Sequence, residues 1–250
     1  MNCVTYGAEH GKTIVLIHGG GLSWWNFRQE AEILKKDYRV VLPILDGHAG
    51  SDRPFTSIED SAEEIISMID RDFGGSVLLI GGLSLGAQVL LEMLSRRKDI
   101  CRHALVESPS AIPSSITAAL TGPMVGCSYA LIKNRAFSKL QFRSLHIRED
   151  LFEDYYRDTC RISKADMKAF LKASVSYSLK EEIKESIADV HIYAGERETK
   201  VVLKSAELIR NTIPGCSLTI LPNLYHGEFS INHPDEYVEA VKSFISRKSG

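Results

Sequence analysis

The sequence predicts an α/β protein built on a mostly parallel, doubly wound sheet that carries a helical insertion. Short runs of β-branched and aliphatic residues alternate with longer segments of helical periodicity, which is typical of parallel strands covered by helices. The alternation stops over residues 113–186 and then resumes. We therefore expect a core formed by residues 1–112 and 187–250, interrupted by a helical insertion at residues 113–186. A chain of 250 residues can bury a sizeable core of this kind.

Six strands and five covering helices are predicted outside the insertion. The strands are expected at residues 13–19, 38–45, 76–82, 103–109, 189–195 and 217–222. The helices are expected at residues 25–36, 56–72, 85–97, 203–213 and 234–248. The second of these helices opens with Thr56 and Glu59, which have the spacing of a capping box. Two further helices, at 149–161 and 163–178, are expected inside the insertion.

The composition excludes several classes of protein and site. The 30 Lys and Arg residues against 32 Asp and Glu give a net charge of −2, without the basic excess of a nucleic-acid binder. The five cysteines are odd in number and scattered, which indicates reduced thiols in a cytoplasmic protein. The N-terminal residues lack the basic and apolar regions of a secretory signal, and no His, Cys, Asp or Glu residues have metal-ligand spacing.

One uncharged stretch, residues 108–132, is long enough to span a bilayer. It contains three prolines and many Ser and Thr residues, which lower its hydropathy. We therefore expect no transmembrane helix there. The stretch instead begins the helical insertion.

A candidate nucleophile lies in the segment Gly82-Leu83-Ser84-Leu85-Gly86, which matches G-x-S-x-G. A predicted strand precedes it directly and a predicted helix follows directly, as a nucleophile elbow requires. The serine of such an elbow has a strained backbone, and glycines two residues to either side remove a collision of side chains. The turn directs the Ser84 hydroxyl to solvent and leaves the N–H of Leu85 free at a helix N-terminus.

A serine needs a base and an acid, and two later loops supply candidates. His226 directly follows the last predicted strand, so it lies at the edge of the sheet where ligands bind in open α/β folds. Glu198 lies in the loop after the strand at 189–195. Ser84, Glu198 and His226 then follow the chain order nucleophile, acid, base. Glu107, at the end of the strand at 103–109, is the alternative acid.

The residues His18 to Gly21, "HGGG", follow the first predicted strand. A backbone N–H in this turn can approach a tetrahedral intermediate, because no side chain shields it. We expect the N–H groups of Gly20 and Leu85 to form an oxyanion hole. The alternative is that these small residues only form a turn.

Together these motifs resemble the α/β-hydrolase fold family in its "HGxG…GxSxG…D/E…H" form, over nearly the whole chain. The resemblance implies that Ser84 is the nucleophile, His226 the base, and Gly20 with Leu85 the oxyanion donors. It places Glu198, in "GERE", where the family usually has an aspartate, and it implies that the helical insertion caps the active site. The segment "LPILDGHAGSD" resembles a family loop in which Ile44 replaces an aspartate and Ala49 a glycine.

An apolar roof over the site is the expected role of the uncharged stretch. Leu120, Met124, Val125 and Tyr129 would line it, and Trp24, just after "HGGG", would line the pocket. Such a lining suits an acyl or aryl group better than a charged substrate. The alternative is that these residues pack the insertion onto the core.

The sequence thus predicts a serine hydrolase that cleaves a small or medium acyl compound with water, most simply a carboxylic ester, without metal or organic cofactor. A thioesterase, a carbon–carbon bond hydrolase, an amidase and an acyltransferase share these catalytic parts and stay open. So does a slow-turnover ligand receptor, which resembles the family and keeps its catalytic residues. The oligomeric state is not indicated.

Overall fold

A computed structural model describes residues 1–246, and its central feature is a seven-stranded sheet. The strands lie in the order β1–β3–β2–β4–β5–β6–β7, and all neighbours are parallel except β1 and β3. This confirms the predicted mostly parallel α/β class. The strand bounds are β1 Cys3–Tyr6, β2 Thr13–Ile17, β3 Arg39–Pro43, β4 Val77–Leu83, β5 Cys101–Glu107, β6 Asp189–Gly195 and β7 Ser217–Leu221.

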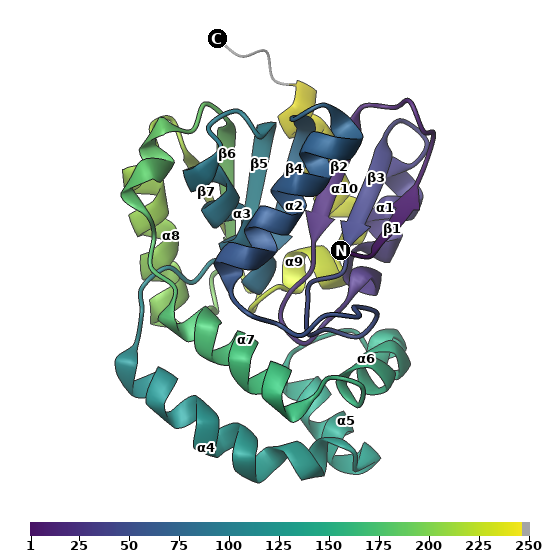
Figure 1. Ribbon diagram of the computed structural model, residues 1–250, viewed down its shortest axis with the longest axis vertical. Helices are drawn as coiled ribbons and strands as arrows, with labels where there is room; N and C mark the ends of the chain where they lie inside the picture. The colour runs from purple at the N-terminus through teal and green to yellow at the C-terminus, as the bar shows by residue number, and fades with distance from the viewer. Residues whose placement is uncertain (247–250) are drawn as a thin grey trace.

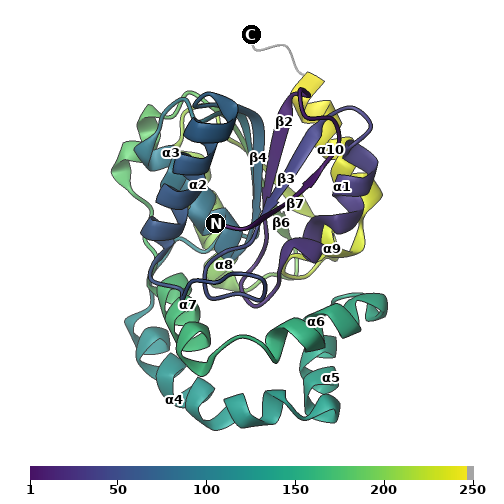
Figure 2. The ribbon, with the colours of Figure 1, turned by 45° about the vertical axis from the view of Figure 1, so that its right-hand side comes forward.

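Helices cover both faces of the sheet, as a doubly wound fold requires (Figures 1 and 2). One face packs on α1 (Arg28–Leu34) and α10 (Pro234–Ser246). The other packs on α2 (Ile58–Phe73), α3 (Leu85–Arg96) and α8 (Lys200–Thr212). Alternate residues of β2 point to the two sides: Val15 joins one apolar cluster and Leu16 the other.

Four helices connect β5 to β6: α4 (Ser115–Ile132), α5 (Arg135–Ser144), α6 (Phe152–Thr159) and α7 (Lys164–Ser176). They form a separate layer below the carboxyl ends of the parallel strands (Figures 1 and 2). Helices are the only regular elements of residues 113–186 in the structure. The bounds of the two units, 1–112 with 187–250 and 113–186, stay a prediction.

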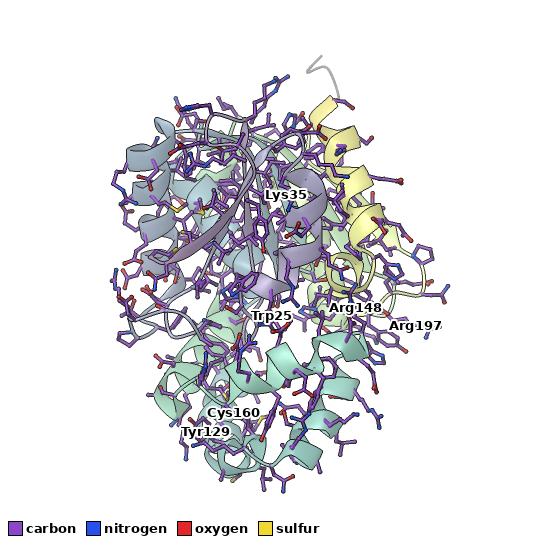
Figure 3. The ribbon with its side chains drawn as sticks, turned by 90° about the vertical axis from the view of Figure 1, so that its right-hand side faces the viewer. Trp25, Lys35, Tyr129, Arg148, Cys160 and Arg197 are labelled. Atoms are coloured by element: carbon purple, nitrogen blue, oxygen red, sulfur yellow. The ribbon has the colours of Figure 1, made fainter. Side chains whose placement is uncertain are left out.

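Directed polar contacts connect the helical insertion to the core. The indole Nε1 of Trp25 donates to Asp158 Oδ2 at 2.9 Å, and both side chains are buried. Trp25 lies where the core meets the insertion (Figure 3). The backbone N–H of Phe55 donates to Asp166 Oδ1, also at 2.9 Å. The insertion is therefore held by directed bonds as well as by apolar packing.

The structure differs from the predicted elements in small ways. β1 was missed because it has four residues and alternates at the sheet edge, and the five-residue helix α9 (Glu228–Asn232) is too short for a periodic signal. The helix predicted at 25–36 divides into a 3-10 turn, Trp24–Phe27, and α1. The end of the helix predicted at 234–248 lies outside the described residues.

The start of α2 corrects the predicted capping box. Ser57, not Thr56, is the N-cap: its Oγ accepts from the N–H of Asp60 at 3.0 Å. Ser57 has an extended backbone and Ile58 is the first helical residue, so the cap lies one residue later than the sequence pattern indicated.

The helix α4 is long and apolar enough to cross a membrane by length and composition, with a mean hydropathy of 1.3. These two properties alone do not show a span. Only 17% of its residues are buried, so α4 differs from the buried helices that cover the sheet. Its buried side faces α7, and the rest of the helix lies on the outside of the insertion (Figures 1 and 2).

We predict that Gly86→Ala destabilises the fold. A β-carbon at Gly86 would lie 2.2 Å from the carbonyl oxygen of Ile17, so α3 would have to move away from β2. The expected loss is about 1–3 kcal/mol or more in the free energy of unfolding, measured by urea denaturation. Gly126→Ala is the control, because a β-carbon there meets no atom within 4 Å. Equal stability of the two variants would contradict the prediction.

Candidate active site

Ser84 occupies the tight turn between β4 and α3. Its backbone has φ 53° and ψ −110°, an unusual conformation for a residue with a side chain. A β-carbon on Gly82 would lie 2.4 Å from the carbonyl oxygen of Gly86, so the turn can be this tight only with glycine there. The Ser84 N–H donates to the carbonyl oxygen of Glu107 at 3.0 Å, which ties the turn to β5.

The structure brings Ser84, His226 and Glu198 together in one hydrogen-bonded series. Ser84 Oγ lies 2.9 Å from His226 Nε2, and His226 Nδ1 lies 2.8 Å from Glu198 Oε2. Because a carboxylate accepts only, the proton of a neutral His226 is on Nδ1, which leaves Nε2 to accept from the serine hydroxyl. The Glu198 side chain is fully buried, whereas 48% of the His226 side chain is exposed toward the pocket.

The loops that carry Glu198 and His226 are hydrogen-bonded to each other. The N–H of Glu196 donates to the carbonyl oxygen of Leu221 at 2.8 Å, and that of Arg197 donates to Leu224 at 3.0 Å. The ends of β6 and β7 are thereby extended as a pair, which brings Glu198 within hydrogen-bond distance of His226 Nδ1.

Two opposing effects act on the pKa of His226. Burial alone would lower it, but the hydrogen bond and charge of Glu198, together with the charge of Glu107, raise the pKa above its ordinary value. The arrangement therefore favours the imidazolium form, which a general base must adopt once it has taken a proton.

Glu107, the alternative acid, accepts from a different partner. Its Oε1 receives the backbone N–H of Ser230 at 3.1 Å. Burial raises the pKa of Glu107 to about 7, which is the behaviour of a carboxyl without a strong cationic partner. The geometry thus pairs His226 with Glu198, while Glu107 holds the start of α9 behind the site.

The two predicted oxyanion donors are adjacent in space. A β-carbon on Gly20 would lie 3.5 Å from the β-carbon of Leu85. Leu85 is the first residue of α3, so its N–H lacks a partner within the helix. Both N–H groups therefore belong to the turn regions that meet beside Ser84, where β2 and β4 end and the strand order reverses.

Two buried histidines hold the loop of Gly20, a role that the sequence analysis missed. His48 Nε2 accepts from the N–H of Gly21 at 3.0 Å, and His18 Nε2 accepts from Leu45 at 3.1 Å. Burial lowers the pKa of His18 to about 3 and that of His48 to about 4, so both rings are neutral. The histidines of "HGGG" and "DGHAG" were the available signal for this network.

A cavity of about 330 Å³ opens beside Ser84 and His226. Its wall is largely apolar and comes from the core and from the residues that follow α5: Leu22, Leu83, Leu145, Ile147 and Ile231. Polar side chains form part of the same lining: His146, Arg197, Thr199 and Tyr225. This composition suits an apolar acyl group with a few polar contacts.

None of the five residues expected from the sequence to bind substrate lines this cavity. Leu120 and Met124 are exposed and Val125 is buried on the α7 side of α4. Tyr129 donates through its hydroxyl to the carbonyl oxygen of Ile162 at 2.8 Å. Trp24 lies under the Arg28 guanidinium, 5.6 Å from the ring centre. The four residues of α4 are kept from the cavity because α7 lies between α4 and the sheet (Figures 1 and 2).

The segment after α5, which the sequence did not reveal, supplies the pocket wall instead. His146 has φ 56° and its ring stacks on Tyr225 with centres 3.8 Å apart. Asn232 joins the segment to α9 by donating to the His146 carbonyl oxygen at 2.7 Å and accepting from the Arg148 N–H at 3.0 Å. The insertion is thus bonded to the elements on either side of His226.

The model of the alpha/beta hydrolase family matches residues 14–240. The chain belongs to the alpha/beta hydrolase family. In this hydrolase, the elbow, the loop after β2 and the loops after β6 and β7 meet at the carboxyl edge of the sheet. In the described part of the chain, residues 1–246, no group of three His, Cys, Asp or Glu residues is arranged to hold a metal ion.

Curated relatives and a solved structure extend the comparison. The hydrolase is 27% identical over 107 residues to epoxide hydrolase 3 of Xenopus tropicalis, covering 41% of this chain and 29% of that protein. It is 31% identical over 90 residues to the soluble epoxide hydrolase of Corynebacterium sp. (strain C12), covering 31% of each chain. The matches thus span less than a third of both relatives. A thermophilic esterase from Thermogutta terrifontis has a TM-score of 0.79 and 16% identity, covering 98% of this chain and 92% of that one.

We predict that His48 changes the pH dependence of stability. His48 is neutral when folded but gains a proton below pH 6.5 when unfolded, so it destabilises the fold as the pH falls from 6.5 to about 4. Buried Glu30 and Glu107, whose pKa values are raised by burial, act in the opposite sense. The test is therefore the difference between wild type and His48→Gln, which keeps an acceptor that does not titrate.

Between pH 6.5 and 4, the free energy of unfolding of the wild type is expected to fall relative to that of His48→Gln. The expected difference in slope is about 1.4 kcal/mol per pH unit. Urea denaturation at stepped pH measures both proteins. Parallel profiles would contradict a neutral, structural His48.

Proposed function

We propose that this alpha/beta hydrolase cleaves a small or medium acyl compound, most simply a carboxylic ester, through an acyl-enzyme on Ser84. The observation that carries the proposal is the series Ser84–His226–Glu198, with contacts of 2.9 Å and 2.8 Å. A serine hydroxyl is a weak nucleophile alone, and an adjacent base positioned by a carboxylate is the arrangement that activates it.

In the first half-reaction, Ser84 Oγ forms a bond to the carbonyl carbon while its proton moves to His226 Nε2. Glu198 stabilises the imidazolium through Nδ1. The carbonyl oxygen gains negative charge, and the N–H groups of Gly20 and Leu85 donate to it. When the carbon–oxygen bond of the ester breaks, the proton on His226 passes to the departing alkoxide, which leaves as the alcohol.

In the second half-reaction, His226 takes a proton from water and the resulting hydroxide adds to the acyl carbon. The bond to Ser84 then breaks, Ser84 recovers its proton from His226, and the carboxylic acid leaves. The cavity of about 330 Å³ and its apolar wall support a small or medium acyl group.

The names of the two curated relatives raise epoxide opening as a rival reaction. Attack of a serine oxygen on an epoxide carbon would leave an alkyl ether, which lacks a carbonyl for water to attack and would trap the enzyme. Attack on an acyl carbon leaves an ester, which the same base can hydrolyse. The serine at position 84 therefore favours acyl chemistry over epoxide chemistry.

The same steps would serve the alternative reactions, which differ only in the leaving or accepting group. These are cleavage of a thioester, an amide or an activated carbon–carbon bond, and acyl transfer to an acceptor other than water. A slow-turnover receptor would keep the residues but lack steady turnover. We place the protein in the cytoplasm, a proposal supported by its five free cysteines.

Replacing the nucleophile is the direct test of the mechanism. We expect Ser84→Ala to lower kcat for p-nitrophenyl esters by about 1,000-fold or more, because no hydroxyl remains to form the acyl-enzyme. The steady rate of p-nitrophenol release measures kcat for both proteins. The acyl length that gives the highest rate indicates the size of the group that the cavity accepts. Turnover that survives in Ser84→Ala would exclude the serine mechanism, and the absence of multiple turnovers in wild type would favour a receptor.

Matched substitutions of Glu198 and Glu107 distinguish the two candidate acids. We expect Glu198→Gln to lower kcat/KM by about 1,000- to 10,000-fold, because the amide no longer stabilises the Nδ1–H tautomer and the imidazolium. In wild type, activity is lost as the pH falls through the raised pKa of His226, so the acid limb should lie above 6.5. Glu198→Gln should move that limb to lower pH.

Glu107→Gln is the control for this experiment. It removes a charge near His226 without removing its hydrogen-bond partner, so a much smaller loss of kcat/KM is expected. A larger loss from Glu107→Gln than from Glu198→Gln would assign the acid to Glu107 instead.

A further inference from the structure

The outer side of α4 exposes an apolar stripe. Ile116, Leu120, Met124 and Leu131 are exposed by 75%, 53%, 64% and 48%. Their spacings of four and seven residues place them on one side of the helix. Thr121, Val125 and Ile132 are the buried residues of α4 and lie on a different side of the helix. The apolar character of α4 beyond that buried side has no role in packing the insertion.

Of the residues that the structure describes, the charged side chains next to α4 that form no ion pair are lysines. Residues 108–148 contain no Asp or Glu. The four cations in and after α5 pair with Glu149, Asp150 and Glu153, which leaves Lys133 as the cation of this segment outside those pairs. On α7, Lys164, Lys168 and Lys172 recur every four residues and are all exposed. Within residues 1–246, no ion pair forms at Lys133 or at these three lysines.

The lysines of α7 lie along the flank of α4. Lys164 Nζ donates to the carbonyl oxygen of Gly126 at 3.3 Å. The Cε atom of Lys168 would lie 3.5 Å from a β-carbon placed on Gly122. The ammonium groups therefore border an uncharged helix, with long stems that can direct the charge outward.

We infer that this face, made of Ile116, Leu120, Met124 and Leu131 with the lysine row 164, 168 and 172, docks on an anionic lipid surface. The exposed, uncharged side of α4 enters the boundary between headgroups and acyl chains, and the lysines along its flank are attracted to anionic headgroups. A second copy is the weaker occupant, because a two-fold contact through the same face would bring two lysine rows together without carboxylates to pair them.

The docking face continues toward the cavity. Leu140 and Leu145, in and after α5, are exposed by 69% and 41%, and Leu145 also lines the cavity beside Ser84. When the protein is docked, the opening of the cavity at Leu145 would lie near the lipid. An acyl substrate dissolved in the membrane could then enter without crossing water; this consequence rests on the proposed function, whereas docking itself does not.

Vesicle co-sedimentation of the full chain tests docking without any assay of hydrolysis. Phosphatidylcholine vesicles are compared with vesicles that contain about one-third phosphatidylglycerol, at low and high salt. We expect binding to the anionic vesicles that weakens in high salt. The double variant Leu120→Ser with Met124→Ser should lower the affinity for anionic vesicles by about 10-fold or more. Replacing any one lysine of the row by Gln should lower that affinity by about five-fold.

Ile187→Ser is the matched control. Ile187 is exposed by 73%, but it precedes β6 at the amino end of the sheet, away from the insertion. This variant should bind vesicles as wild type does. The double variant should keep its turnover of soluble esters, because Leu120 and Met124 are away from the cavity, and that turnover also shows that it folds.

A probe on the face itself gives a second readout. Cys127 is exposed on α4, and Cys3, the other exposed cysteine, is replaced by Ser so that a polarity-sensitive fluorophore labels Cys127. A blue shift on adding anionic vesicles supports docking. Absence of both binding and shift, or equal binding by the double variant, would overturn the inference. So would a lipid-free dimer that Leu120→Ser with Met124→Ser dissociates, since a second copy would then cover the face.

Discussion

The contact of backbone with backbone around the elbow is the constraint on which the rest of the site depends. The helix α3 lies so close to β2 and β4 that a single β-carbon on Gly86 or Gly82 would collide with a carbonyl group. The approach brings the first turn of α3 beside the loop of Gly20, and it forces Ser84 into its strained conformation. Ser84 and the N–H groups of Gly20 and Leu85 are thus positioned by main-chain packing.

The sequence predicted most of this arrangement because its signals are local or periodic. The buried strands appear as aliphatic runs, and the elbow appears as two glycines around a serine between a strand and a helix. The acid and base could be placed at one edge because all carboxyl ends of parallel strands lie there. The choice of Glu198 over Glu107 depended on which side chain reaches His226, and only the three-dimensional structure shows that contact.

The residues that line the pocket could not be predicted from the sequence. An apolar helix without charges has no distinct polar side, so the sequence of α4 does not indicate which residues face inward. The residues that do line the cavity after α5 lie in a loop, where no periodicity exists. The buried histidines 18 and 48 were likewise assigned no role, because a histidine that accepts from a backbone N–H has the same sequence signature as a solvated one.

The order of the site residues along the chain has a consequence for refolding. Ser84 and His226 are 142 residues apart, and the whole helical insertion lies between them. The loop that closes when they meet is therefore long, and its closure requires β5, β6 and β7 to pair in register first. We therefore expect the hydrogen bond between these two side chains to form late in refolding, so that its recovery reports completion of the topology and not merely the return of helical signal.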